Sequence, residues 1–197
     1  PILKLELPTL YACGVKTVGM VAIGAWGYGG CENYILAKLM WDAGADVVID
    51  RFAGVDIPTS DYDTWFDDGH GLVQMGDWPD YFPNDYEGRL AGHPLTITVG
   101  GHDHALTFDL PGAWVGRGFW AYGWDNDALG WVSDSSYPNI IQARYGSLRG
   151  RVVSARDYAP GRAVYLGLNT YGSLAGAVEK TLLQNAVDWS GSCGRFG

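Results

Sequence analysis

The stretch VGMVAIGAWGYGGCENYILAKLMWDAGADVVID, residues 18–50, decides the fold. It opens with an apolar run at 18–23, which is typical of a strand buried on both faces. A Gly-rich loop leads into a helical pattern from Glu32 to Ala43, whose apolar residues recur near helical spacing. A second apolar run, Asp46 to Asp50, supplies another strand. The segment therefore predicts a right-handed β-α-β unit with parallel strands.

The next strand is predicted at GLVQM, residues 71–75, and ends abruptly at Gly76-Asp77-Trp78-Pro79. The segment before it, 60–66, fits either a strand or a short helix capped by Ser60. Only four residues separate Phe66 from Gly71, whereas a parallel crossover needs about a dozen. A helix or an irregular turn is therefore favoured for 60–66.

Regular structure is expected again at 163–168, as a strand, and at 174–189, as an amphipathic helix. Residues 78–160 hold short segments rich in Gly, Trp and Asp, and they predict an elaborated region with antiparallel edge strands. The short strands expected there are 95–99, 113–115, 128–132 and 140–143. We expect residues 1–197 to form one α/β domain, a three-layer sandwich with a mostly parallel sheet and an irregular Trp/Gly-rich second half.

Composition limits the classes of partner. The net charge is −9, with only 4 Lys in 197 residues. Such acidity argues against a nucleic-acid binder, which needs a basic face, and against anionic membrane surfaces. No apolar stretch is long enough to span a bilayer. Cys13 and Cys193, near opposite ends of the chain, would fasten the termini if they were joined in an oxidising compartment.

Several segments carry a family resemblance. The opening β-α-β unit, the strand GLVQMGD, the phrase GHPLT at 92–96 and the closing segments RAVYLGL (162–168) and LLQNAVDW (182–189) resemble the class I glutamine amidotransferase-like superfamily, most closely its ThuA-like and other non-amidotransferase branches. The resemblance covers about half of the chain, at its two ends. It implies a flavodoxin-like sandwich with ligands at the carboxyl ends of the strands.

The resemblance also implies where catalytic groups would stand. Catalytic members place a Cys on a sharp turn after a central strand, and a His followed by Pro-Glu after a late strand. The matching turn here is Gly76-Asp77-Trp78, and the late strand runs into Gly167-Leu168-Asn169-Thr170. Neither segment holds the nucleophile or the base that acyl transfer requires. Glutamine hydrolysis is therefore not expected.

Ligand contacts are then expected from three loops at the strand ends, 24–31, 76–82 and 169–173. The residues predicted to bind a ligand are Trp26, Tyr28, Gly29, Gly30, Asp77, Trp78, Asn169 and Thr170. Cys31 follows the Gly-rich loop at the start of the first helix, where oriented backbone N–H groups would lower the pKa of a thiol. The alternative role for Cys31 is a small buried side chain that packs the helix on the sheet.

Two further patterns suggest a divalent metal. His102 and His104 would point to one face of a strand and, with Asp109 nearby, could ligate zinc. The alternative is a polar loop whose histidines bond to neighbouring carboxylates. Asp125-Asn126-Asp127 could hold calcium but lacks EF-hand spacing, and a turn built from residues that favour turns is the preferred interpretation.

The stretch AWVGRGFWAYGWDNDALGW, residues 113–131, is aromatic, and Trp114, Trp120 and Trp124 are predicted to form a surface. Exposed rings among Asp and Asn suit a sugar face or a protein interface, whereas a satellite core under a long loop is the alternative. The sequence predicts a non-catalytic binding or assembly module, outside the cell or on its surface, that binds a protein partner, a second copy or a carbohydrate. A hydrolase using Cys31, or a metal held by His102 and His104, is the other interpretation.

Overall fold

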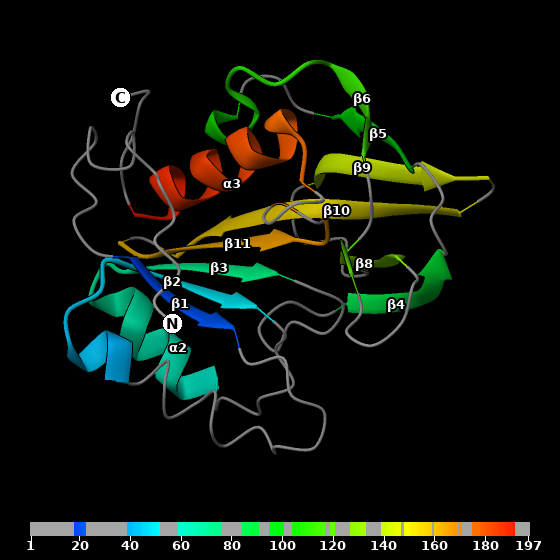
Figure 1. The fold of residues 1–197 in the computed structure, drawn as a ribbon. Coiled ribbons are helices and arrows are strands. Elements are labelled where there is room, and N and C mark those ends of the chain that lie inside the picture. The colour runs from blue at the N-terminus through cyan, green and yellow to red at the C-terminus, as the bar shows by residue number, and fades with distance from the viewer. Residues whose placement is uncertain are drawn as a thin grey trace.

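The computed structural model is an α/β fold built on one large sheet (Figure 1). The structure describes residues 18–22, 39–51, 59–75, 84–90, 95–100, 104–116, 119–120, 127–132, 139–146, 148–158, 160–168, 170 and 175–191.

Eight described strands form the large sheet, in the order β1-β2-β3-β11-β10-β9-β5-β6. The parallel half contains β1 (Val18–Ala22), β2 (Val47–Arg51), β3 (Gly71–Met75) and β11 (Arg162–Leu166). The antiparallel half contains β10 (Leu148–Asp157), β9 (Asn139–Tyr145), β5 (Leu95–Val99) and β6 (Ala113–Gly116). A smaller sheet contains β4 (Asn84–Leu90), β8 (Asp127–Val132) and β7 (Phe119–Trp120), in that order, and its β8 lies beside β10.

Helices lie on opposite faces of the parallel half. Figure 1 shows α3 (Ala177–Ser190) above the sheet and α2 (Thr59–Asp67) below it. Successive side chains of a strand point to opposite faces, so each buried strand supplies both cores. The α3 side buries, among others, Val47, Ile49, Val73, Met75, Val164, Leu166, Leu182 and Val187. The α2 side buries Trp41, Val48, Tyr62, Trp65, Phe66, Leu72, Ala163 and Tyr165.

The segment that fits either a strand or a helix is the helix α2. Tyr62, Trp65 and Phe66 have the i, i+3, i+4 spacing of one helical face, and all three are buried. Two polar groups are satisfied across this contact: Gln74 Nε2 donates to the Tyr62 hydroxyl (3.1 Å), and Trp65 Nε1 donates to the carbonyl of Gly71 (3.1 Å). The aromatic face of α2 is thereby fixed on β3.

The expectation of a mostly parallel sheet in a three-layer sandwich needs correction. Three of the seven strand pairings in the large sheet are parallel and four are antiparallel. The helix α2 packs only on strands of the parallel half, so the layering does not extend over the whole sheet. The physical reason is β10, which pairs antiparallel with β11 and continues the sheet through hairpin-type neighbours that need no crossover helix. Neither α2 nor α3 is long and apolar enough to cross a membrane.

Candidate functional site

The carboxyl edge of β3 and β11 is the natural place for a site. These strands are parallel neighbours, and Met75 lies opposite Leu166 at their ends. The chain leaves β2 toward α2 on one face and leaves β11 toward α3 on the other. Open α/β sheets commonly bind ligands at the carboxyl ends of their strands, where the connections turn to opposite faces.

Thr170 lies at this edge. Its side chain is fully buried, and its hydroxyl is 3.9 Å from the sulfur of Met75 at the end of β3. This contact joins the segment after β11 to the end of β3. A thioether sulfur is a weak acceptor, so this hydrogen bond is weak. The two lone pairs of the Thr170 hydroxyl oxygen remain available as acceptors.

Glu179 is a buried carboxylate at the start of α3, the helix that follows β11. Its side chain is 5 % exposed, and its Oε1 accepts a hydrogen bond of 2.9 Å from the indole Nε1 of Trp114 on β6. A carboxylate in the first turn of a helix is favoured by the helix dipole. The bond joins residues 65 positions apart and ties the edge strand β6 to α3.

Two glycines make room for this carboxylate. A Cβ at Gly116 would lie 2.7 Å from Glu179 Oε1 and 3.1 Å from Trp114 Nε1, and a Cβ at Gly176 would lie 2.7 Å from Glu179 Oε2. Both oxygens are therefore in close contact with backbone that carries no side chain. The position of Glu179 is fixed by packing as well as by its hydrogen bond.

His104 has a different environment, against the C-terminal end of α3. Its Nδ1 accepts a hydrogen bond of 3.2 Å from the backbone N–H of Leu106, so His104 caps the short 3₁₀ helix η2 (Ala105–Thr107). Its ring centroid lies 5.1 Å from that of Trp189. Burial, and then the positive charge of Arg162, lower the pKa of His104 below its ordinary value. Neutral imidazole is the form that can accept this bond.

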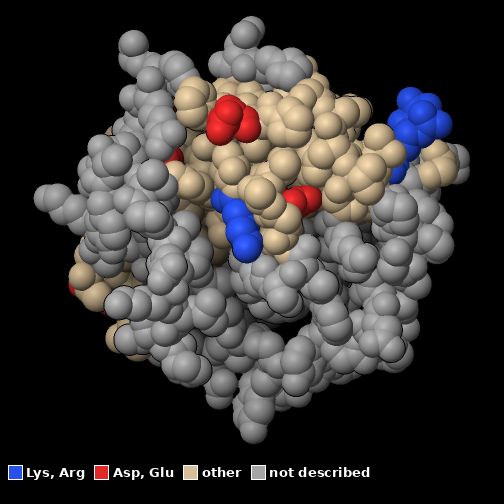
Figure 2. Space-filling view, turned by 45° about the horizontal axis from the view of Figure 1, so that its top comes forward, with Lys and Arg blue, Asp and Glu red and all other residues tan. Residues whose placement is uncertain are grey.

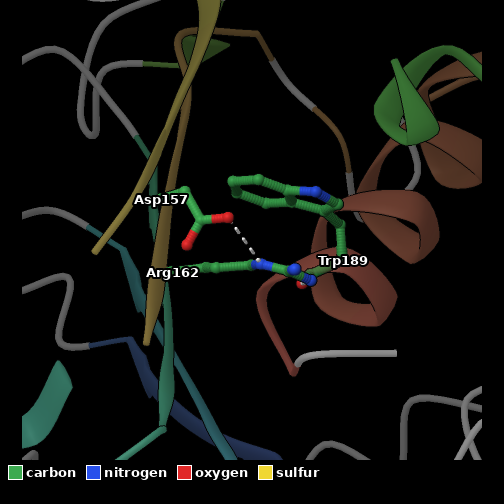
Figure 3. A network of polar contacts seen from close by, with 3 residues as sticks. All are labelled: Asp157, Arg162 and Trp189. Carbon is green, nitrogen blue, oxygen red and sulfur yellow. Dashed lines mark hydrogen bonds and ion pairs between the residues drawn. The ribbon is translucent and has the colours of Figure 1, made fainter. Parts of the chain in front are cut away.

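Arg162 links this region to the sheet (Figure 3). Its guanidinium lies over the ring of Trp189, 5.1 Å from the centroid, and its Nη1 donates to the Trp189 carbonyl (3.1 Å). Arg162 Nε is 3.4 Å from Asp157 Oδ2, an ion pair on a partly exposed surface. Because Arg162 is the first residue of β11, this network lies at the amino edge of the parallel strands. His104 and Thr170 are thus at opposite ends of the sheet and do not share one site.

The metal ligands predicted from sequence are only partly described. Asp109 is exposed and adopts a positive φ of 58° in the turn after η2, and His104 uses Nδ1 as a cap. Within the described ranges, no group of three His, Cys, Asp or Glu side chains is placed to hold a metal ion. His102, the partner predicted for His104, and the residues 125–126 of the predicted calcium turn lie outside those ranges.

Several other predicted site residues are also outside the described part of the chain. These are Trp26, Tyr28, Gly29, Gly30, Cys31, Asp77, Trp78, Trp124 and Asn169, together with Cys13 and Cys193. Trp120 belongs to β7 by its backbone. Trp114 is half-buried and packs against the core beside α3, with its indole N–H bonded to Glu179.

Sequence reasoning missed Glu179 and Asn185, two polar residues of α3 that the fold buries. Asn185 Nδ2 donates to the carbonyls of Leu106 (3.2 Å) and Phe108 (2.7 Å) and so holds η2 on the helix. One sequence signal was available for Glu179, because it stands three residues after Gly176 at the N-cap, the position of the carboxylate in a capping box. No local pattern indicates that Trp114 would be its partner.

Comparisons with known proteins bear on the fold. No family model matches the chain, and no curated protein matches it. A solved structure described as ThuA-like, from Parabacteroides merdae, superposes with a TM-score of 0.55 at 15% sequence identity, over 76% of this chain and 71% of that one. A cytoplasmic protein of Salmonella typhimurium superposes with a TM-score of 0.52 at 9% identity, over 84% and 76%.

The chain shares the fold of ThuA-like proteins. Those proteins belong to the class I glutamine amidotransferase-like superfamily, so the resemblance observed at the two ends of the sequence is supported at the level of fold. At such low identity, residue roles do not transfer between the chains, and the chemistry of this protein must be argued from its own residues.

Proposed function

We propose that this protein is a non-catalytic amidotransferase-like module that binds or assembles with a partner, outside the cell or on its surface. The proposed contact region is the carboxyl edge of β3 and β11, where the buried Thr170 packs on Met75 and joins the two strand ends. The partner is another protein, a second copy of the chain or a carbohydrate, and the proposal needs no cofactor.

One observation carries the proposal. The ends of β3 and β11 are adjacent, and Thr170 contacts Met75 across them. The resemblance to catalytic amidotransferases implies a nucleophile and its base in the segments that follow these two strands. The chain instead continues as GDWP after β3 and as GLNTYG after β11, with neither Cys nor His in either segment. Nucleophilic acyl transfer needs both groups within hydrogen-bond reach.

The charge distribution supports a partner other than nucleic acid. The net charge is −9. Figure 2 shows one face on which Asp and Glu side chains stand among the described Lys and Arg side chains. Tracking a phosphate backbone takes a continuous basic surface. A protein or sugar surface makes no such demand.

The proposal is tested by the reactivity of Cys31. Native protein is alkylated over a range of pH, and the modified cysteine is located by mass spectrometry. We expect labelling of Cys31 either only on unfolding or with a midpoint near the roughly 8.5 of an ordinary thiol. Fast labelling with a midpoint well below that value, together with ester or amide hydrolysis that Cys31→Ser abolishes, would establish a hydrolase instead.

A second measurement addresses the metal. The protein is dialysed against buffer containing zinc or calcium, then against metal-free buffer, and its metal content is determined. Retention below one equivalent is expected. One equivalent of zinc that is retained by the native chain and lost in His104→Asn would favour the metal-dependent alternative, since three or four converging ligands would then be present.

A further inference from the structure

The β9–β10 hairpin carries a concentrated positive surface on an acidic protein. Arg144 and Arg149 are direct cross-strand partners, and Arg151 follows on the same side, opposite Gln142. Arg144 and Arg149 are exposed, and Arg151 is partly exposed. We refer to Arg144, Arg149 and Arg151 as the arginine face.

The fold does not require this arrangement. Like charges directly opposite each other on neighbouring strands are destabilising. The register positions beside the arginine face on β9 and β5 are Gln142, Thr96 and Thr98, which are exposed and uncharged. Arg144 Nε donates to the backbone carbonyl of Gly146 (3.0 Å) rather than to a carboxylate. Among the described side chains, no carboxylate therefore pairs with Arg144 or Arg149, and their positive charges lie close together.

A negative surface lies on α2. Asp63 and Asp67 are one helical turn apart, and Asp68 follows the last residue of the helix; all three are exposed. Like charges at i and i+4 are also destabilising. The last turn of α2 contains no basic residue. We refer to Asp63, Asp67 and Asp68 as the acidic face.

Both faces lie on the same side of the large sheet. On β9, Ile141 and Ala143 point into the core on the α3 side, so Gln142 and Arg144 point to the other side, the one that α2 covers over the parallel strands. The two faces belong to different halves of the sheet, because α2 packs on β3 and β11 whereas the arginine face is on β9 and β10.

We infer that this chain self-associates, the arginine face of one copy docking on the acidic face of another. The inference rests on the proposed assembly function and names its partner as a second copy. The argument for that partner is charge complementarity. One chain carries both halves of the contact, and the like-charge pairs Arg144–Arg149 and Asp63–Asp67 are each unfavourable until the opposite face covers them. Because the two faces share one side of the sheet, two copies facing each other can make the contact twice, as a closed dimer requires.

Charge reversal is the sharpest test of this contact. Added salt is less informative, because it screens both the local attraction and the repulsion between two chains of net charge −9. Two variants are compared by sedimentation equilibrium: Arg144→Glu with Arg149→Glu, and Asp63→Lys with Asp67→Lys. Lys180→Glu, an exposed change on α3 at the other side of the sheet, is the control for altered net charge. Thermal melting followed by circular dichroism verifies that each variant is folded.

We expect the wild type and Lys180→Glu to associate with rising concentration, in the micromolar range of a weak contact, about 1 to 100 μM. Each double variant should associate at least about tenfold more weakly, because attraction becomes repulsion. An equimolar mixture of the two double variants should associate again, since the reversed faces are complementary.

Three results would overturn the inference: a wild type that remains monomeric throughout this range, double variants that associate as the wild type does, or a mixture that remains monomeric although both variants are folded. None of these three results contradicts the proposed function. The proposed function is contradicted by Cys31-dependent hydrolysis or by a retained catalytic metal, and neither is measured in this experiment. Binding of an anionic polysaccharide to the arginine face of a monomer would likewise replace the second copy as the partner.

Discussion

The bond between Trp114 and Glu179 offers a direct test of how the edge of the large sheet is attached to α3. Trp114→Phe removes the indole N–H that donates to Glu179 Oε1 at 2.9 Å, while keeping an aromatic ring in the half-buried position. Glu179 is 5 % exposed, so water cannot readily replace the lost donor. A hydrogen bond to a charged group is worth about 1.5–3 kcal/mol, and more is lost if the carboxylate stays buried and unpaired.

The coupling free energy between Trp114 and Glu179 is measured by a double-mutant cycle with Trp114→Phe, Glu179→Leu and the combined variant. The free energy of unfolding is measured for all four proteins by urea denaturation. We expect a coupling energy of about 1.5–3 kcal/mol, because in the Glu179→Leu background Trp114→Phe removes a donor that has no acceptor. For a chain of this size, 1 kcal/mol shifts the melting temperature by about 2–4 °C, so a loss of about 1.5–3 kcal/mol in Trp114→Phe corresponds to a fall of about 3 to 12 °C.

Glu179→Gln is the matched control. The amide oxygen can still accept from Trp114, but a neutral bond is about half as strong as a charge-assisted one. Its destabilisation should therefore be smaller than that of Glu179→Leu. A coupling energy below about 0.5 kcal/mol, the value of an exposed and screened pair, would refute the reasoning that burial makes this bond strong.

Three further predictions concern the contacts of α3. Gly71→Ala places a Cβ 2.4 Å from the carbonyl oxygen of Ser190, a backbone atom that cannot rotate away as a side chain can. We therefore expect urea denaturation to show a destabilisation of about 3 kcal/mol or more. A loss under about 1 kcal/mol would contradict the close approach. Asn185→Ala removes two hydrogen bonds to the carbonyls of Leu106 and Phe108. Amide hydrogen exchange in residues 104–110 should therefore accelerate about tenfold or more relative to β3. Unchanged exchange would show that η2 is held by other contacts. Because the pKa of His104 is lowered on folding, the unfolded chain takes up the proton first, and the wild type should lose stability as the pH falls through about 6.5 toward the folded pKa. His104→Asn, which keeps a capping acceptor, should lose less stability over the same pH range, and parallel pH profiles of the two proteins would contradict this assignment.

The parallel half of the fold was predictable because its strands are continuous apolar runs. The expected strand at 71–75 is β3 with the same bounds, and the expected strand at 46–50 is β2, shifted by one residue. The choice of a helix before β3 is confirmed by α2, since too few residues remained for a parallel crossover. The closing helix, predicted at 174–189, is α3, Ala177–Ser190.

The antiparallel half was harder to predict. The expected strands at 95–99, 113–115 and 140–143 correspond to β5, β6 and β9, but β10, the longest described strand, was missed. In its sequence LRGRVVSARD, arginines and a glycine precede the short apolar stretch VVSA. A bulge near Val153 also disturbs the alternation of its side chains. A strand with irregular alternation gives little periodic signal.

What the sequence by itself determined about this protein is its α/β class, most of the strands of the large sheet, and the absence of Cys and His in the segments that follow β3 and β11. These follow from local apolar runs and from residue identities, which need no knowledge of neighbours. Only the tertiary structure decided that the sheet is half antiparallel, that Thr170 contacts Met75, that Glu179 pairs with Trp114, and that His104 lies at the opposite edge from Thr170. Each of these depends on strand order and on contacts between residues far apart in the chain, and these are fixed by how the two faces of the sheet are covered rather than by any local pattern.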